Sequence, residues 1–306
     1  MSNLIDSVKA TMKSQETEGA FELYVTRTPG YLWALLFKSI GVHPIAVTLF
    51  SIVIGAAAGW FFGQESRWLN LAGMGLLIWA NWYDCADGQL ARMTGKTTLI
   101  GRVLDGFGGD VWFFSIYFFI CLRFTPQWGV WIWLVGAVAG LYCHSKQCQL
   151  ADYYRNIHLF FQKGRDRSEL DNSARQQTEY ASLRWNRAEW FNKLYLHFYM
   201  SYTRSQENMT PRFQRFYKIL SRKYPADPPQ DLRNEFCAGS RPLMPLCNVL
   251  TFDTRVGVLF LTTLLGVPWV YFLFEILVLE PLRFYVRSRH ERLCLELQDK
   301  YFPDEV

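Results

Sequence analysis

The amino-acid sequence predicts an all-α integral membrane protein with six transmembrane helices, an N-terminal interfacial helix and a large cytoplasmic helical insertion. Three observations predict this class. Half of the 306 residues are apolar and only 19% are charged, below the quarter that is usual in soluble domains. Several stretches have the roughly 20 apolar residues that cross a bilayer as a helix. Arg and Lys gather beside the ends of these stretches, as in membrane proteins.

Residues 1–42 form a cytoplasmic and interfacial N-terminal segment in this prediction. Its beginning lacks the apolar core and small-residue cleavage site of a signal peptide. Thr28, Pro29 and Gly30 predict a break in the chain. The stretch 31–42 is short and aromatic and carries one Lys, which is typical of an amphipathic helix in the membrane interface.

Six stretches approach the length of a transmembrane helix, four in a first membrane domain, 43–148, and two in a second, 244–288. The second stretch continues into DCADGQLAR without a strong stop signal. The six predicted spans lie at 44–63, from about 69 into that motif, and at 98–123, 128–148, 246–264 and 266–286.

Between the fourth and fifth spans lies a polar insertion, residues 149–243, and a cytoplasmic tail, 289–306, follows the sixth. The insertion carries 16 Arg and Lys. Its stretch 178–203 mixes aromatic residues with Arg and Glu, so we expect folded helices rather than low-complexity disorder. Basic segments of this kind are attracted to anionic lipid.

The positions of the basic residues predict the orientation of the spans. Arg92, Lys96 and Arg102 lie in the short loop between the second and third spans, which the positive-inside rule places in the cytoplasm. The N-terminus, the insertion and the tail then face the cytoplasm as well. We expect an integral, multi-pass membrane protein whose site faces the cytoplasm, in the cell inner membrane if the protein is bacterial.

The cysteines and the net charge exclude other classes. None of the seven Cys forms a C-x-x-C pair, so zinc and redox spacings are absent and we expect no disulfides. The net charge of +5 follows the span ends and forms no nucleic-acid-binding patch. Nucleic acid is therefore not an expected partner.

An acidic cluster at the cytoplasmic ends of the second and third spans is the strongest functional signal. Asp84 and Asp87 share one helix face, and Gly101 and Asp105 share a face of the next helix. A short turn would bring the three carboxylates together. Intramembrane carboxylates are costly and usually functional. The alternative is that they cap helices or lie solvated at the membrane surface.

Three clustered carboxylates need cations or shifted protons. Oxygen ligands suit Mg²⁺, Mn²⁺ or Ca²⁺, and metals held in this way commonly clamp phosphates. Gly88 and Gly101 would leave room for a nucleotide to approach the backbone. The cluster therefore predicts a metal site that holds a pyrophosphate.

The same stretch resembles the signature of the CDP-alcohol phosphotransferase family, D-x2-D-G-x2-A-R-x8-G-x3-D-x3-D. The positions that match at the family's spacing are Asp84, Asp87, Gly88, Ala91, Arg92, Gly101 and Asp105. The resemblance implies an enzyme and a homodimer, with a CDP-linked lipid or CDP-alcohol donor in a cavity open to the cytoplasm. It implies that an alcohol attacks phosphorus and that CMP is released.

The resemblance also implies roles for these residues. Gly88, Ala91, Arg92 and Gly101 would bind the CDP moiety. Two divalent ions, Mg²⁺ or Mn²⁺, would be held by Asp84, Asp87 and Asp105, and also by Asp110 if it replaces the family's fourth Asp.

The fourth Asp of the signature departs from the family pattern, because Gly109 stands at its position and Asp110 follows. On a regular helix this shift turns the side chain by about 100°. A π-bulge in the glycine-rich stretch 106–109 would return Asp110 to the site. We therefore predict catalytic roles for Asp105 and Asp110, with Asp110 as the acceptor base. The alternative is that Asp110 points elsewhere and the enzyme is weaker or altered.

Basic residues near the cytoplasmic side are candidates for binding an acceptor phosphate. We predict Lys146 and Arg255, of which Arg255 follows Asp253 in an apolar helix. The alternatives for Arg255 are a structural pair with Asp253 or a side chain that reaches lipid headgroups. His144 is expected to be structural.

Two donor types fit the motif. We favour transfer of a phosphatidyl group from CDP-diacylglycerol to a small polar alcohol, such as inositol phosphate, glycerol phosphate or inositol. The alternative is transfer of a phosphoethanolamine or phosphocholine headgroup to the hydroxyl of diacylglycerol or a ceramide. A cation transporter or an inactive relative is a third reading, but a transporter would spread its acidic residues over several spans.

Overall fold

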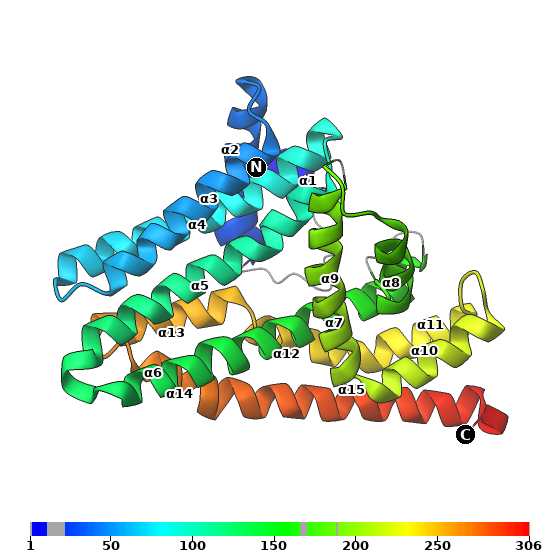
Figure 1. Ribbon diagram of the computed structural model, residues 1–306. Coiled ribbons are helices and arrows are strands. Elements are labelled where there is room, and N and C mark those ends of the chain that lie inside the picture. Colours follow the sequence, from blue (N-terminus) through cyan, green and yellow to red (C-terminus); the bar gives the residue numbers. More distant parts are fainter. Residues whose placement is uncertain (1, 11–21, 166–169, 188, 306) are drawn as a thin grey trace. The chain divides into compact units, whose positions relative to one another are not determined.

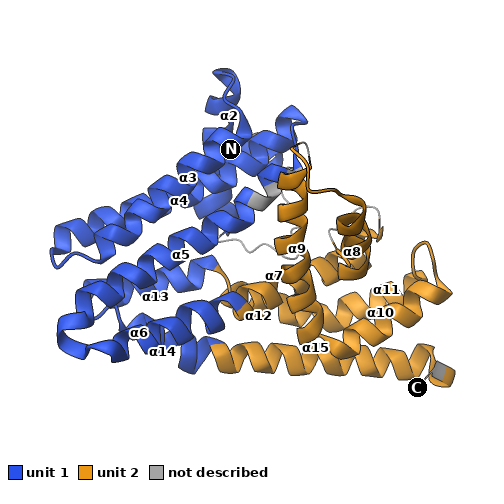
Figure 2. Cartoon of the chain, viewed as in Figure 1, with its two compact units in different colours: residues 1–145, 252–279 blue, residues 146–251, 280–306 orange. Residues whose placement is uncertain are grey.

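The computed structural model describes residues 2–10, 22–165, 170–187 and 189–305. Every regular element in these ranges is a helix, which confirms the predicted all-α class (Figure 1). The chain forms two compact units (Figure 2). Unit 1 comprises Met1–Ser145 and Phe252–Leu279, and unit 2 comprises Lys146–Thr251 and Glu280–Val306.

Three helical stretches of the described residues are long and apolar enough to cross a membrane, at Pro44–Phe62, Leu104–Trp128 and Gln230–Leu264. They support an integral membrane protein, whereas the number of six spans stays a prediction.

Unit 1 begins with α1 (Ser2–Ala10), η1 (Glu22–Arg27) and α2 (Thr28–Ser39). The break predicted at residues 28–30 is wrong, because the π-helical η1 runs directly into α2. Pro29 lies in the first turn of α2, where proline is tolerated. The rings of Trp33 and Phe37 pack against Tyr83, which fixes α2 on the next-but-one helix.

The centre of unit 1 consists of α3 (Pro44–Phe62), α4 (Arg67–Thr94) and α5 (Leu99–Trp128). Small residues allow the helices to approach closely. A Cβ atom on Gly55 would lie 2.2 Å from the ring of Trp112, and the Ser115 hydroxyl donates a 2.7 Å hydrogen bond to the carbonyl of Ala56.

The turn between α4 and α5 is as short as the sequence predicts. Gly95 ends α4 with a φ of +67°, a left-handed conformation that glycine adopts easily. Thr98 then caps α5, because its hydroxyl accepts a 3.0 Å hydrogen bond from the amide of Gly101. This turn sets the spacing between the acidic ends of the two helices.

The remaining elements of unit 1 are shorter than α3, α4 and α5. They are α6 (Val130–Ala137), η2 (Val138–His144), α13 (Phe252–Leu264), α14 (Val270–Phe274) and η5 (Glu275–Leu279). The predicted fifth stretch, 246–264, is interrupted at residues 250–251. Helix α12 (Met244–Val249) ends just before them, and the Thr251 hydroxyl donates a hydrogen bond to the Asn248 carbonyl. The predicted sixth stretch, 266–286, contains the π-helical η5.

Unit 2 is also helical and has an aromatic core of its own. Its elements are α7 (Ser145–Lys163), α8 (Ser173–Ser182), α9 (Trp190–Met209), α10 (Pro211–Lys223), α11 (Gln230–Ser240), η4 (Arg241–Leu243), α12 (Met244–Val249), α15 (Glu280–Tyr301) and η6 (Pro303–Glu305). Phe161, Phe216 and Phe236 stack on one another and are fully buried. The described residues of 149–243 are largely helical, and the cytoplasmic insertion stays a prediction.

Candidate active site

The structure brings three predicted carboxylates together in unit 1. Asp84 and Asp87 lie one turn apart on α4, and Asp105 lies in the second turn of α5. Asp84 forms a side-chain hydrogen bond with Asp105, and the charge of Asp105 also acts on Asp87. The short turn at Gly95 therefore brings the three carboxylates together, as the spacing of the motif predicts.

The carboxylates leave oxygen atoms unsatisfied. Asp84 Oδ1 and Asp87 Oδ2 are buried, and neither has a hydrogen-bond partner among the described residues. Asp87 as a whole is only 4% exposed. A buried acceptor without a partner costs about 1–3 kcal/mol, and more when it is charged. Because hard oxygen donors suit Mg²⁺ and Mn²⁺, this donor set fits the divalent metal that the motif implies.

Two arginines lie within electrostatic reach of the cluster. The charge of Arg27, in η1, acts on Asp84, and the charge of Arg92, in α4, acts on Asp87. The Trp82 indole and the Gln89 amide hold η1 on α4, with hydrogen bonds of 2.9 Å to the carbonyl of Val25 and 3.2 Å to that of Arg27. Arg27 also pairs with Glu22, with 3.2 Å between Nη2 and Oε1, so the exposed Arg92 is the better placed of the two to contact the phosphates of a nucleotide.

Sequence reasoning missed Arg27 because no motif links it to the acidic stretch. It also missed Thr48 of α3, whose buried hydroxyl hydrogen-bonds to Asp87. The available signal was modest: Thr48 is a polar residue on an apolar helix. Only the packing of η1 and α3 on α4 reveals these two contacts.

The residues predicted to bind CDP lie around the same helix end. A Cβ atom on Gly88 would lie 3.5 Å from Arg92 Nη1, so the glycine leaves space beside an exposed guanidinium. A Cβ atom on Gly101 would lie 3.1 Å from Thr98 Oγ1, so any larger residue at this position would crowd the capping threonine of α5. Ala91 is half-buried on α4. This arrangement suits the approach of a phosphate group to Gly88 and Arg92.

Asp110 lies elsewhere. The predicted π-bulge is wrong, because α5 is a regular α-helix from Leu99 to Trp128 and nothing near Gly106 or Gly109 forces an extra residue out of it. Asp110 is not among the groups that act most strongly on Asp84 or Asp87. Its charge interacts with His144 instead.

Asp110 and His144 line a cavity of about 490 Å³ in unit 1. The other walls are largely apolar and come from α5, α6 and η2. None of the described residues that line the cavity is Arg or Lys; they include Phe107, Phe114, Phe118, Trp133, Ala137 and Leu141. The role of Asp110 as a base stays a prediction, and it would require an acceptor hydroxyl that reaches this cavity.

The predicted acceptor residues make other contacts. Arg255 is fully buried, pairs with Glu275, and donates a 2.9 Å hydrogen bond to His144 Nδ1. The Tyr271 hydroxyl also donates to Glu275, so a polar network links α13, η5 and η2. The ammonium group of Lys146, in unit 2, donates a 2.5 Å hydrogen bond to the Ser205 hydroxyl.

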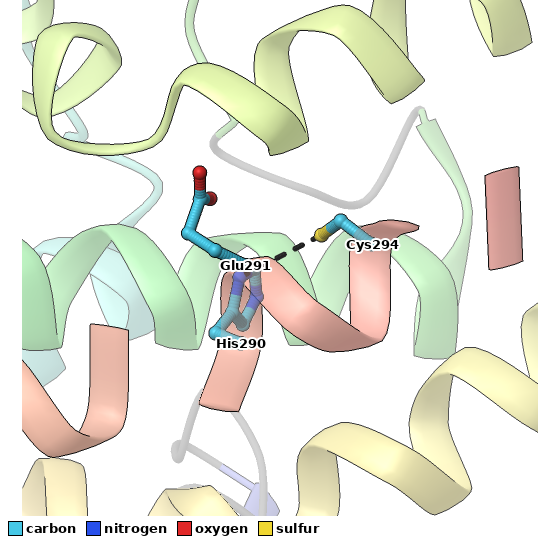
Figure 3. A group of neighbouring side chains, drawn as sticks. All are labelled: His290, Glu291 and Cys294. Carbon is cyan, nitrogen blue, oxygen red and sulfur yellow. Dashed lines mark hydrogen bonds between the residues drawn. The ribbon is translucent and has the colours of Figure 1, made fainter. Parts of the chain in front are cut away.

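A second group of possible metal ligands lies in unit 2, where His290, Glu291 and Cys294 of α15 have ligand atoms within 4.8 Å of one another (Figure 3). The positions of these side chains are explained by their contacts within unit 2, without a metal ion. Glu291 caps α10 by accepting hydrogen bonds from the amides of Arg212 and Phe213, at 2.7 and 3.4 Å. Burial lowers the pKa of His290 to about 3, so the ring is neutral.

The donor set also differs from that of the acidic cluster. Thiol and imidazole ligands suit zinc, whereas carboxylates suit the ions that bind phosphates. Cys294 Sγ already lies 3.8 Å from His290 Nδ1. We therefore place the candidate active site at the acidic cluster and not at this group.

Comparison with known proteins agrees with that placement. Residues 41–150 match the model of the family described as CDP-alcohol phosphatidyltransferase, a range that contains α3, α4 and α5 with all four Asp residues. No curated protein and no solved structure matched the chain. Residues 41–150 thus match a CDP-alcohol phosphatidyltransferase domain, and the members of that family are transferases of phosphate-containing groups.

Proposed function

We propose that this enzyme transfers a phosphatidyl group from CDP-diacylglycerol to a small polar alcohol and releases CMP. The family implies the coarser reaction, transfer of a phosphatidyl or phosphoalcohol group from a CDP-alcohol. Inositol phosphate, glycerol phosphate and inositol are the proposed acceptors. The observation that carries the proposal is the pair of buried, unpartnered oxygens, Asp84 Oδ1 and Asp87 Oδ2, beside Asp105 and two arginines.

The residues of the cluster have complementary roles in this proposal. Asp84, Asp87 and Asp105 would hold Mg²⁺ or Mn²⁺, which would supply positive charge against the diphosphate. Arg92 and Arg27 bind phosphate oxygens of the donor. The acceptor hydroxyl forms a bond to the lipid-linked phosphorus, and the bond from that phosphorus to CMP breaks. Asp110 accepts the proton of the hydroxyl.

Lys146 and Arg255, the two residues predicted to bind the acceptor, have different roles in this proposal. Lys146 stays in the proposal as a cation near the end of the predicted fourth span. Arg255 is already compensated by Glu275, and a buried Arg with a carboxylate partner has little charge left for a substrate. We therefore propose that Arg255 supports the packing of η2 and η5 rather than the acceptor.

A second candidate function is favoured by the cavity beside Asp110. Its apolar walls and the absence of Arg and Lys among the described lining residues suit a lipid hydroxyl better than a phosphate. In that case a phosphoethanolamine or phosphocholine group would move from a CDP-alcohol to diacylglycerol or a ceramide.

The purified, full-length enzyme decides between these functions. It would be incubated with radiolabelled CDP-diacylglycerol or CDP-ethanolamine and a panel of acceptors, with and without Mg²⁺ or Mn²⁺. We expect metal-dependent CMP release with CDP-diacylglycerol and a polar alcohol. Release only with CDP-ethanolamine and a lipid alcohol would select the second function. No CMP with any pair would favour a transporter or an inactive relative.

A further inference from the structure

Helix α9, which is labelled in Figure 1, belongs to unit 2 and carries a row of exposed large apolar side chains. Trp190, Phe191, Leu194 and Phe198 are 49%, 40%, 38% and 66% exposed. Trp190, Leu194 and Phe198 are spaced by four residues, and Phe191 lies beside them, so the four side chains share one side of the helix. We refer to these four residues as the α9 aromatic face.

The opposite side of α9 already has a packing role. Its buried residues include Tyr195, Leu196, Met200 and Thr203. The Thr203 hydroxyl accepts a 3.1 Å hydrogen bond from Gln176 of α8, which fixes that side within unit 2. The α9 aromatic face is therefore a second apolar surface, and the described residues of unit 2 leave it exposed.

Basic residues flank the α9 aromatic face. Arg184 and Arg187 are exposed just before the helix, next to Trp185, which is 63% exposed. The ammonium group of Lys193 lies 5.6 Å from the Trp185 ring. The single acid in residues 184–198 is Glu189, whose carboxylate accepts a 2.7 Å hydrogen bond from the Arg184 amide. The surface around the face is therefore positively charged.

We propose that the α9 aromatic face lies in the interface of an anionic bilayer, with Arg184 and Arg187 at the lipid headgroups. Exposed Trp and Phe beside Arg are typical of helices that lie in the membrane interface. The charge complements anionic lipid. The chain also carries helices apolar enough to span a membrane, so unit 2 is tethered near a bilayer and needs only modest intrinsic affinity. This inference is independent of the donor and the acceptor.

The test uses the full-length protein in nanodiscs that contain phosphatidylglycerol. A photoreactive benzoylphenylalanine would replace Phe198 in one sample and Asn192, exposed on another side of α9, in a second. We expect lipid adducts, measured by mass spectrometry, to be several-fold more abundant at position 198. Equal adducts at both positions would overturn the proposal. Cross-links from position 198 to protein would assign the face to a partner chain or to a second copy.

The electrostatic part has its own test. The double variant Arg184→Glu and Arg187→Glu should lower lipid adducts at position 198 several-fold in phosphatidylglycerol nanodiscs and little in phosphatidylcholine nanodiscs. Lys218→Glu, at an exposed position of α10, is the matched control and should change neither. An equal decrease in both lipids would contradict the role of the two arginines.

Discussion

Two groups of buried or partly buried ionisable side chains in unit 1 differ in how their charges are compensated. This difference distinguishes a candidate binding site from a structural network. In the acidic cluster, the carboxylates of Asp84, Asp87 and Asp105 lie together and act on one another as like charges. In the network of η2, α13 and η5, Arg255 and Glu275 have opposite charges and bond to each other. Buried charge thus marks a binding site where it is uncompensated, and supports packing where it is paired.

The largest effect should come from removing a carboxylate of the cluster. Asp87→Asn should lower CMP release by a factor of about 10³ or more, because it removes several kcal/mol of metal-based charge stabilisation and each 1.4 kcal/mol is tenfold. Without metal, the variant should unfold at the same temperature as wild type or higher, since like charges repel. Activity and thermal unfolding in EDTA measure the two effects.

The matched control for this variant is Asp231→Asn, at an exposed position of α11. It should leave both measurements unchanged. Turnover near that of wild type in Asp87→Asn would show that the cluster is not the catalytic centre.

Asp110 tests whether the active site extends beyond the cluster. If it is the acceptor base, Asp110→Asn and Asp110→Ala should both lower kcat by about 10²-fold or more, the usual contribution of general base catalysis. CMP release under saturating acceptor is the measurement. Near-normal turnover in both variants would assign Asp110 to the cavity beside His144 and not to the chemistry.

The paired network should respond in stability rather than in chemistry. Arg255→Met should destabilise the protein by about 3–5 kcal/mol, because it leaves Glu275 buried and unpaired. The double variant Arg255→Met and Glu275→Leu should recover most of that loss. Denaturant unfolding in detergent measures both.

The same double variant distinguishes support from substrate binding. A structural pair predicts an unchanged KM for the acceptor once stability is recovered. A raised KM with full stability would return Arg255 to the acceptor site.

The smallest effect concerns the pH dependence of unit 2. Because the pKa of His290 is lowered from 6.5 to about 3, the unfolded chain binds an extra proton between those values. The stability is therefore present above pH 6.5 and falls as the pH decreases, by about 2 kcal/mol between pH 7 and pH 5. Hydrogen exchange of α15 at several pH values measures this fall.

His290→Phe should flatten the pH dependence, and His197→Gln, at an exposed position, should leave it intact. A metal ion bound at His290 would instead make this stability sensitive to chelators. Sensitivity to EDTA in α15 would contradict the packing role.

Much of the architecture could be predicted from the sequence, because hydropathy and turn chemistry act locally. The helix that continues from about residue 69 into the acidic motif, the short turn after it and the meeting of Asp84, Asp87 and Asp105 could all be predicted in this way. Contacts between distant segments could not be predicted. Arg27 reaches Asp84 only because η1 packs on α4, and Glu275 rather than the nearby Asp253 pairs with Arg255.

The wrong prediction of a π-bulge before Asp110 has a different cause. A glycine-rich stretch allows a π-bulge, but it does not require one, and the regular hydrogen bonding of α5 is retained. Glycine content shows where a helix can deform; only the packing around it decides whether it does.

The most direct test of the central claim is Mn²⁺ binding to the full-length protein, followed by electron paramagnetic resonance. The account predicts that wild type binds Mn²⁺, that CDP-diacylglycerol changes the signal, and that Asp84→Asn and Asp87→Asn abolish binding. The double variant of Arg255 and Glu275 should bind as wild type does. Undiminished Mn²⁺ binding by both Asp variants would contradict the assignment of the acidic cluster as the metal site.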